Sequence, residues 1–541
     1  MADDYELGRV LDLPVVDPEE LENAWLVWSV LLRRHPGAPF LRMEQGAILA
    51  SLAKAPMPYG VFASAGVGSG KSLVALLAGH VTKAKRPLIL CPPGLESELR
   101  LQYEEWKEHY PLVLPKVLAY SRLSRPEGAT AIDTYRPDLI VCDEIQALKL
   151  VSSARTKRFR RYLKENPTTV RVLGMSGTMT GGDLEDMAFH LKATLRDRAP
   201  IPLRQGAVDV WAAVIDPDGF PDPAERKALE PLRKWSGKRD WEEAFFARLV
   251  ATPGVICSRE ASIDIPLVIR KHKTKTSPVL KEALDRLKAD WVTPDGEALL
   301  DTKDLVRYAR NLAAGFYYRL GPAPSPEWEE ARREWGRHLR VLLEYRSRRG
   351  FDSPLLVETA LRESTAPSYA EAKEALLLWD TFREQRRPPT EVVWLDDKPL
   401  RGFVEQWVEK NQTGLLWFRS RAVRDLLKDM GLDVRAGGDA PPRNEPLAAV
   451  QVDRFNAGFN LQYGRSTMAV LEPLANAIYW DQLIARVHRP GQTAPVVTCD
   501  IFLPAWPYDQ ALDKATKKAA SIAKKTGSKH RLLLADYKEE D

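Results

Sequence analysis

Two stretches of alternating strand-like and helix-like sequence predict an α/β protein with two parallel-sheet domains and a large helical region between them. In the first stretch, from Met43 to about Asp197, short apolar runs alternate with helical patterns. The second stretch, from about Gly414 to Pro504, has the same alternation. Continuous apolar strands separated by helices are typical of a parallel sheet that is covered on both faces.

The elements follow in order along the chain. The expected strands of the first domain are 61–63, 88–91, 117–120, 139–142 and 170–175, and those of the second are 415–418, 448–452, 467–471 and 496–503. The stretch between the domains is rich in Trp, has helical patterns broken by Pro, and is too long for a linker. The predicted organisation is an N-terminal helical segment (1–40), a first α/β domain (41–198), a helical accessory region (199–410), a second α/β domain (411–510) and a basic helical tail (511–541).

The composition is that of a globular protein with several domains: 541 residues, 44% hydrophobic and 28% charged. We find neither a signal-peptide pattern nor an apolar run long enough to cross a membrane, so we expect a soluble cytoplasmic protein with no membrane partner. The four cysteines stand far apart without CxxC spacing, which indicates neither disulfides nor zinc. The net charge of +5 does not by itself argue for nucleic acid.

The segment AGVGSGKS (65–72) lies between an apolar run and a helical one, which predicts a strand, a phosphate-binding loop and a helix. Lys71 is expected to reach the β- and γ-phosphate oxygens, and the Ser72 hydroxyl to bind Mg²⁺. The backbone N–H groups of Gly68, Ser69 and Gly70 are expected to surround the phosphate. A purely structural glycine turn is the alternative.

Asp143 and Glu144 end the apolar run LIVCD, where open α/β sheets place their ligands. Asp143 is expected to hold Mg²⁺, and Glu144 to orient and deprotonate the attacking water. A solvated Asp-Glu pair at the end of a strand is the alternative. The phosphate-binding loop upstream favours the catalytic interpretation.

Near the other end of the chain, QLIARVHRPGQ (482–492) is predicted to be helical. Arg486 and Arg489 are three residues apart, which on a helix places both guanidinium groups on one face. From there they could reach a γ-phosphate and stabilise charge in the transition state, as arginine fingers do. A solvated basic end of a helix is the alternative.

These segments, with MSGTMT (175–180) and GFNLQ (458–462), resemble in order motifs I, II, III, V and VI of superfamily 2 helicases and translocases of the Swi/Snf-like branch. The final motif is the most specific one. LRMEQGAIL (41–49) resembles the glutamine motif, and motifs Ia, Ib and IV have counterparts at 88–106, 117–123 and 414–427. The resemblance covers both α/β domains and leaves the middle third nearly unmatched.

The resemblance implies two RecA-like domains, the P-loop NTPase core of helicases, that bind ATP and Mg²⁺ between them. By this resemblance Gln45 reads the adenine with support from Arg42, and Gln482 completes the nucleotide site with the two arginines. The residues implied to couple the two domains are Ser176 and Thr178, and those implied to lie between the ATP and DNA surfaces are Gly458 and Asn460. The candidate DNA contacts are Tyr120, Ser121, Arg419, Ser420 and Asn460.

Two departures from the family pattern concern the coupling between domains. Gln146 stands where this branch usually has His, and the third motif reads SGT in place of TGTP. The chain therefore resembles a divergent member of the branch. Its tail resembles the ends of compact phage-encoded helicases, which implies a viral origin and the cytoplasm of a bacterial host.

The function implied is that of a DNA-dependent ATPase, a translocase or helicase that couples ATP hydrolysis to movement along DNA, duplex or branched. A helicase that separates the strands of DNA or RNA is one alternative. A nucleotide-gated DNA clamp without catalysis is another, although Lys71, Glu144, Arg486 and Arg489 are all present. We expect a monomer.

Overall fold

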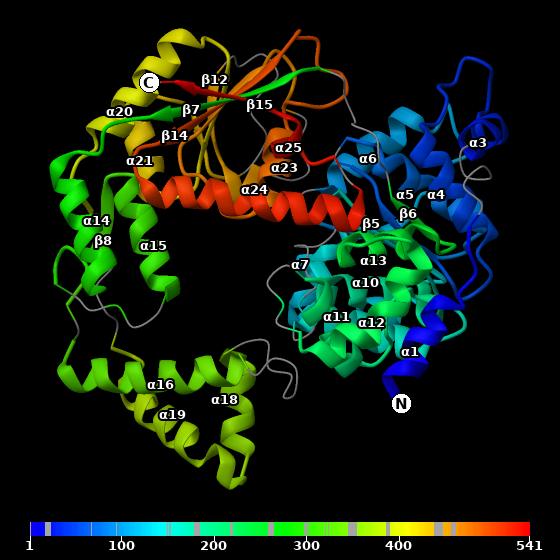
Figure 1. The fold of residues 1–541 in the computed structure, drawn as a ribbon, viewed down its shortest axis with the longest axis horizontal. Coiled ribbons are helices and arrows are strands. Elements are labelled where there is room, and N and C mark those ends of the chain that lie inside the picture. Colours follow the sequence, from blue (N-terminus) through cyan, green and yellow to red (C-terminus); the bar gives the residue numbers. More distant parts are fainter. Residues whose placement is uncertain are drawn as a thin grey trace. The chain divides into compact units, whose positions relative to one another are not determined.

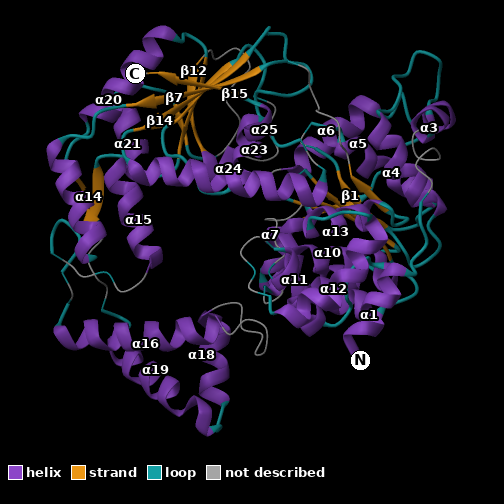
Figure 2. Cartoon of the chain, in the orientation of Figure 1, coloured by secondary structure: helices purple, strands orange, loops and turns teal. Residues whose placement is uncertain are grey.

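Two large parallel sheets organise the chain (Figure 2). The computed structural model describes residues 2–16, 23–66, 68–93, 95–148, 150, 153–177, 184–216, 219, 221–257, 265–296, 299, 302–319, 321–322, 324–344, 354–385, 390–437, 447–455, 461–527 and 529–540. One structural unit comprises Met1–Lys149, Arg158–Thr274 and Gly402–Asp541 and contains both sheets. The other comprises Leu150–Lys157 and Lys275–Arg401.

The first sheet has the strand order β3-β2-β4-β5-β1-β6, with all strands parallel. Its strands are β1 (Val61–Ser64), β2 (Pro87–Cys91), β3 (Lys116–Ala119), β4 (Leu139–Asp143), β5 (Arg171–Ser176) and β6 (Val255–Cys257). Alternate side chains enter two separate apolar cores: Phe62 and Ile140 enter one, and Val61 and Val141 the other. A sheet that is apolar on both faces must be covered by helices on both.

These helices, together with the first sheet, form the first lobe (Figure 1). They are α1 (Ala2–Leu11), α3 (Ala24–Leu32), α4 (Met43–Lys54), α5 (Lys71–Thr82), α6 (Leu95–Trp106), α7 (Tyr120–Ser124), α8 (Ala131–Tyr135), α9 (Ala154–Glu165), α10 (Leu184–Leu195), α11 (Gln205–Ile215), α12 (Pro223–Ser236) and α13 (Trp241–Val250). Only the first part of α9 belongs to the other structural unit.

The second sheet has the order β11-β12-β10-β13-β14-β7-β15 and is also parallel. Its strands are β7 (Leu267–Lys273), β10 (Gly414–Phe418), β11 (Val434–Arg435), β12 (Leu447–Gln451), β13 (Thr467–Val470), β14 (Val497–Leu503) and β15 (Asp536–Glu540). The second lobe is this sheet with α21 (Arg421–Asp429), α22 (Val452–Phe455), α23 (Ala477–Ile484), α24 (Trp506–Thr526) and α25 (Arg531–Leu534). The prediction of two parallel-sheet domains is confirmed.

The other structural unit is mostly helical, as predicted for the middle of the chain. It contains α14 (Pro278–Asp290), α15 (Thr302–Ala313), α16 (Pro326–Glu344), α18 (Pro354–Glu363), α19 (Ala370–Phe382) and an antiparallel pair, β8 (Phe316–Arg319) and β9 (Glu391–Trp394). Side chains of α16, α18 and α19 form a small core around Trp335 and Leu376. Helix α20 (Lys398–Lys410) begins in this unit and ends in the unit of the two sheets.

The predicted domain boundaries differ from the observed ones at three places. Residues 199–257 belong to the first lobe, because β6 pairs with β1 and α11–α13 contribute to its core. Strand β7 lies in the second sheet, between β14 and β15. The tail beyond residue 510 is also part of the second lobe, because its last strand, β15, pairs with β7. Strands β6 and β15 lie at sheet edges, where a strand leaves little signal in the sequence, and β7 (LVIRKHK) has basic residues that interrupt its apolar pattern.

The N-terminal segment is also joined to the first lobe. Leu7 and Val10 of α1 enter its core. Arg248 of α13 is fully buried and donates from Nε to the carbonyl of Val10 at 2.8 Å and from Nη2 to that of Leu13 at 2.7 Å. None of the helices in the described part of the chain is long and apolar enough to cross a membrane.

We expect Arg248→Met to lower the free energy of unfolding by about 3 kcal/mol, because two carbonyl groups lose charge-assisted hydrogen bonds. Urea denaturation followed by tryptophan fluorescence measures this loss. Arg239→Met changes an exposed arginine of the same lobe and is the matched control. Equal denaturation midpoints for the two variants would show that Arg248 does not anchor the N-terminal segment.

Candidate functional site

The ends of three neighbouring strands form the base of the site. Strand β5 lies between β1 and β4 in the sheet. Ser64 of β1 is level with Ser176 of β5, and Asp143 of β4 is level with Met175. The loops that follow β1 and β4 therefore leave the same edge of the sheet, with only the end of β5 between them. This carboxyl edge is where parallel sheets bind ligands.

The loop after β1 depends on two glycines with positive φ. Gly68 has φ 90° and Gly70 has φ 80°, values that favour glycine. Gly70 also lies against Gln45, because a Cβ atom there would be 2.3 Å from the Gln45 amide nitrogen. Gly70 immediately precedes α5, so the positive end of the helix dipole lies next to the loop, as in phosphate sites.

Lys71, the first residue of α5, is buried at 8% exposure. Its ammonium group donates to the carbonyl oxygens of Ala65 at 3.0 Å and Gly66 at 3.4 Å, and lies 3.7 Å from a carboxylate oxygen of Glu144. A cation held between the loop and this acidic group fits the role predicted for it. Ser72 is half-buried and lines the same cavity as Lys71.

Asp143 fits a magnesium ligand. Its Oδ1 atom is buried and has no hydrogen-bond partner among the described residues. Burial and the adjacent Glu144 carboxylate raise its pKa, and Lys71 partly offsets this rise. A cation would satisfy the unpaired oxygen and favour the ionised form. No cluster of three His, Cys, Asp or Glu side chains forms a metal site in the described ranges, but Mg²⁺ at phosphates needs only one or two carboxylates.

Glu144 is held in a fixed position. Its backbone has φ 56°, a left-handed conformation that is uncommon for a residue other than glycine and is often found at functional sites. Its carboxylate accepts hydrogen bonds from the backbone N–H of Gly177 at 3.2 Å and from the side chain of Gln146. Gln146, which stands where the family that the motifs resemble usually has His, thus contacts the candidate base directly.

The two arginines lie beyond the end of α23, in a turn, and not on a helix as the sequence predicted. Helix α23 ends at Ile484, and the N–H of Arg486 bonds to the carbonyl of Leu483. Arg486 is 5% exposed and donates from Nε to the Gln482 carbonyl at 3.0 Å. Burial, together with the charge of Arg489, lowers the pKa of Arg486 to about 9, while Glu144 opposes this shift. A buried guanidinium group beside a half-buried one favours an anion between them.

A single cavity of about 810 Å³ brings these groups together. Its lining includes Lys71, Asp143 and Glu144 from the first lobe and Arg486 and Arg489 from the second. The lobes also touch at the loop itself, because a Cβ atom at Gly68 would be 3.0 Å from Pro490 Cδ. The structure thus joins all five residues that the sequence identified as catalytic, although more than 300 residues separate Glu144 from Arg486 in the chain.

Arg42 and Gln45 close one side of the cavity. Gln45 accepts from the backbone N–H of Arg42 at 2.9 Å and donates to the carbonyl of Gly70 at 3.1 Å. Arg42 donates to the carbonyl of Gly68. Phe40 also lines the cavity and is 49% exposed, with the Arg33 guanidinium group 3.9 Å from the centroid of its ring. This arrangement fits the adenine-reading role that the resemblance implies.

Three other predicted residues lie near the cavity without lining it. Ser69 is 5% exposed, and its hydroxyl has no partner within the described ranges. Gln482 is buried on α23 and contributes the carbonyl that holds Arg486. Ser176 is buried at the end of β5, where its carbonyl accepts from Ala65. Thr178, Gly458 and Asn460 lie outside the described residues.

The candidate DNA contacts have different outcomes. Tyr120 is 1% exposed and belongs to the core of the first lobe, so the prediction that it contacts DNA is wrong for this conformation. Ser121 is half-buried. Arg419 is exposed but lies 3.5 Å from Asp453, and the Ser420 hydroxyl accepts from Val423 to cap α21. Ser121, Arg419 and Ser420 stay predictions.

The sequence reasoning missed residues that line or support the cavity. Tyr463, directly after GFNLQ, lines it from the second lobe, and Phe40 directly precedes the glutamine-like motif. Each of these two residues is adjacent to a motif in the sequence, and that adjacency could have identified them as cavity residues. Arg531, in the tail, supports the turn that carries Arg486 and Arg489, called here the arginine turn. Its Nε atom donates to the carbonyl of His488 at 3.3 Å, and its Nη1 atom donates to both carboxylate oxygens of Asp481 at 3.1 Å. No motif marks Arg531.

We expect Gly70→Ala to abolish tight nucleotide binding while leaving the fold intact. Alanine is strained at this positive φ, and its Cβ would collide with Gln45, so the loop must shift away from its cradle conformation. Binding of a fluorescent ATP analogue, with circular dichroism to check folding, measures this. Gly206→Ala is the control, because its Cβ would meet no atom within 4 Å. Unchanged affinity in Gly70→Ala would argue against a phosphate cradle.

No protein-family model matches the sequence, and no curated protein matches it either. Among solved structures, the chain is similar to the Sulfolobus solfataricus SWI2/SNF2 ATPase core in complex with dsDNA. The two are 13% identical, the match covers 86% of this chain and 88% of that one, and the TM-score is 0.32. Similarity of this degree assigns no function, so the function is inferred from the residues of the site.

Proposed function

We propose that this protein is a DNA-dependent ATPase that couples ATP hydrolysis between its two lobes to movement along DNA, chiefly duplex DNA. The observation that carries the proposal is the shared cavity. It holds an ammonium and two carboxylates from one lobe and two guanidinium groups from the other. This is the set of groups that phosphoryl transfer to water requires.

Each residue has a chemical role in this proposal. Gln45 and Arg42 bind the base, and Lys71 binds the β- and γ-phosphates. Glu144 orients the attacking water and takes its proton, in the position that Gly177 and Gln146 fix. Ser72 and Asp143 would hold Mg²⁺, which neutralises developing charge on the phosphates. These roles need the first lobe alone.

The second lobe supplies the remaining charge. Arg486 is buried and Arg489 is half-buried, so their interaction with an anion is screened less than it would be at the surface. They stabilise the transferring phosphoryl group in the transition state. Contact of both lobes with one phosphate draws the lobes together, and loss of that phosphate releases them. Alternating grip on DNA by each lobe turns this cycle into movement.

DNA as the partner is supported by the order of motifs in the sequence and by the family that they resemble. Ser121, Arg419 and Ser420 are the described candidates for the track along the sugar-phosphate backbone, which is read without regard to sequence. A strand-separating helicase uses the same ATP chemistry, so the two functions are distinguished only by which nucleic acid stimulates hydrolysis. The monomeric state, the cytoplasmic location and the phage origin stay predictions.

We expect Lys71→Ala to abolish ATP turnover, and Arg489→Ala to lower kcat by roughly 10³-fold, as the loss of an arginine finger does. Phosphate release in the presence of DNA is the measurement. Lys428→Ala, an exposed lysine on α21, is the control and should retain wild-type turnover. Hydrolysis at the wild-type rate in either active-site variant would contradict the proposed ATPase site.

We expect duplex DNA to stimulate ATP hydrolysis more than single-stranded DNA or RNA does, with a stimulation that falls as salt rises because backbone contacts are electrostatic. ATPase rates with single-stranded, duplex, forked and four-way DNA and with RNA, at two salt concentrations, measure this. Stronger stimulation by a single strand would favour a strand-separating helicase. Binding of DNA without any turnover by the wild-type protein would favour a nucleotide-gated clamp.

A further inference from the structure

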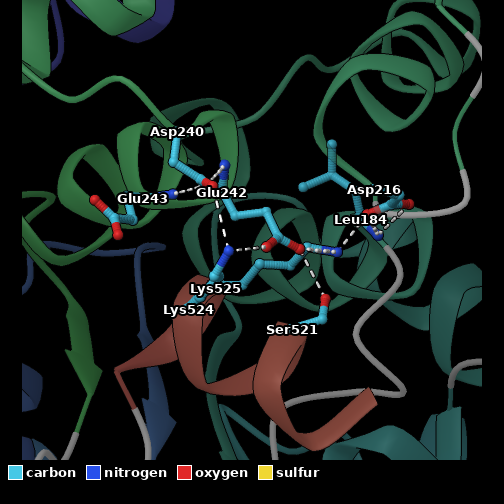
Figure 3. Close-up of polar contacts among 8 residues, drawn as sticks. All are labelled: Leu184, Asp216, Asp240, Glu242, Glu243, Ser521, Lys524 and Lys525. Carbon is cyan, nitrogen blue, oxygen red and sulfur yellow. Dashed lines mark hydrogen bonds and ion pairs between the residues drawn. The ribbon is translucent and has the colours of Figure 1, made fainter. Parts of the chain in front are cut away.

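A lysine of the C-terminal tail is buried against two carboxylates of the first lobe (Figure 3). Lys525, on α24 of the second lobe, has a fully buried side chain. Its ammonium group lies 2.7 Å from Oδ1 of Asp216, which follows α11, and 3.5 Å from Oε1 of Glu242, in the first turn of α13. Ser521, one turn earlier on α24, donates to the same Glu242 oxygen at 2.7 Å. This part of the basic tail therefore makes contacts within the protein.

Asp216 also contacts the start of α10. Its two carboxylate oxygens accept from the backbone N–H of Leu184 at 3.2 and 3.1 Å (Figure 3). Leu184 is the first residue of α10, the next described residue after Gly177. Gly177 donates to the carboxylate of Glu144. Lys525 thus pairs with the carboxylate that caps α10, the helix that follows the Ser176–Gly177 segment.

The other end of the tail contacts the arginine turn. Arg531, on α25, holds Asp481 of α23 through two contacts of 3.1 Å and the carbonyl of His488 at 3.3 Å. His488 lies between Arg486 and Arg489 in the chain. Helices α24 and α25 therefore connect the first lobe with the turn that carries both guanidinium groups (Figure 1).

We infer that Lys525 is a positioning residue: by fixing α24 on the first lobe, it sets where Arg486 and Arg489 stand relative to the phosphate loop. An ammonium group with no exposure must keep its carboxylate partners, because unpaired charge in the interior is costly. The contact therefore holds one arrangement of α24 on α11 and α13. This inference rests on the proposed ATPase function. It adds a residue that controls the rate of ATP turnover although it lies outside the nucleotide cavity.

Lys524 gives a matched comparison. It is adjacent to Lys525 on α24 and lies 3.3 Å from Asp240 and 4.0 Å from Oε2 of Glu242, but its side chain is 51% exposed, and Glu242 keeps Lys525 and Ser521 as partners without it. Exposed ion pairs contribute little because water screens them. Lys524→Met therefore removes one positive charge from the same turn of the same helix without leaving buried carboxylates unpaired.

The experiment compares steady-state ATP hydrolysis in the full chain, with DNA, for the wild type, Lys525→Met and Lys524→Met. We expect Lys525→Met to lower kcat by roughly five- to thirtyfold, the range typical of coupling through a network, with KM for ATP changed by less than about twofold. The nucleotide is bound chiefly by first-lobe residues, which explains the small change in KM. Lys524→Met should match the wild type.

A double-mutant cycle separates positioning from general destabilisation. If Lys525 acts through the arginine turn, adding Lys525→Met to Arg489→Ala should lower kcat little further. Adding it to Gln45→Ala, which changes the base-binding side, should lower kcat by the full factor. Equal losses in both backgrounds, or wild-type kcat in Lys525→Met, would overturn the inference.

Two further variants cover a failure of Lys525→Met to fold. Ser521→Ala removes only the hydrogen bond to Glu242, and Lys525→Met combined with Asp216→Asn and Glu242→Gln leaves no unpaired charge. Both variants should fold and should have a lower kcat than the wild type, and wild-type kcat in both would overturn the inference.

Amide hydrogen exchange of residues 506–526 tests the contact without an activity measurement. Exchange should be faster in the triple variant than in Lys524→Met. If the wild type hydrolyses no ATP, the proposed function fails, and the exchange result still decides whether Lys525 holds α24 on the first lobe.

Discussion

Opposite charges from two lobes, held in one cavity, are the interaction on which the rest of the structure depends. The first lobe contributes two carboxylates and the Lys71 ammonium. The second contributes the buried guanidinium group of Arg486 and the half-buried one of Arg489, and this pair favours an anion beside it. Parallel sheets place loops at one edge, which explains how β1 and β4 bring their residues together. The arginine turn belongs to a different lobe, so the position of the two guanidinium groups at the phosphate loop depends on how the two lobes are placed relative to each other.

Several features of the chain serve that relative position. Pro490 touches the phosphate loop at Gly68, where a side chain would not fit without displacement. The tail returns to both lobes, with Lys525 buried against the first and Arg531 against the arginine turn of the second. Strand β15 then completes the second sheet beside β7. A segment that looks like a basic appendage in the sequence is in fact built into the framework.

The sequence predicted most strands of the two sheets and the charged residues that meet in the cavity, because each leaves a local signal. Buried strands are continuous apolar runs, and the phosphate loop needs glycines at fixed spacing. Other features depend on partners far away in the chain. Lys525 resembles any exposed lysine until Asp216, more than 300 residues earlier, is placed beside it. Tyr120 could be taken for a surface residue because burial of a tyrosine is decided by packing, and Arg486 is in a turn because α23 ends at Ile484.

The most direct measurement is a structure of the protein with a non-hydrolysable ATP analogue and Mg²⁺. We expect the triphosphate in the cavity between the lobes, with Lys71 and at least one of Arg486 and Arg489 within hydrogen-bonding distance of the γ-phosphate, and Asp143 at the magnesium ion. A nucleotide held by the first lobe alone, with both guanidinium groups turned away from it, would contradict a catalytic site shared between the two lobes.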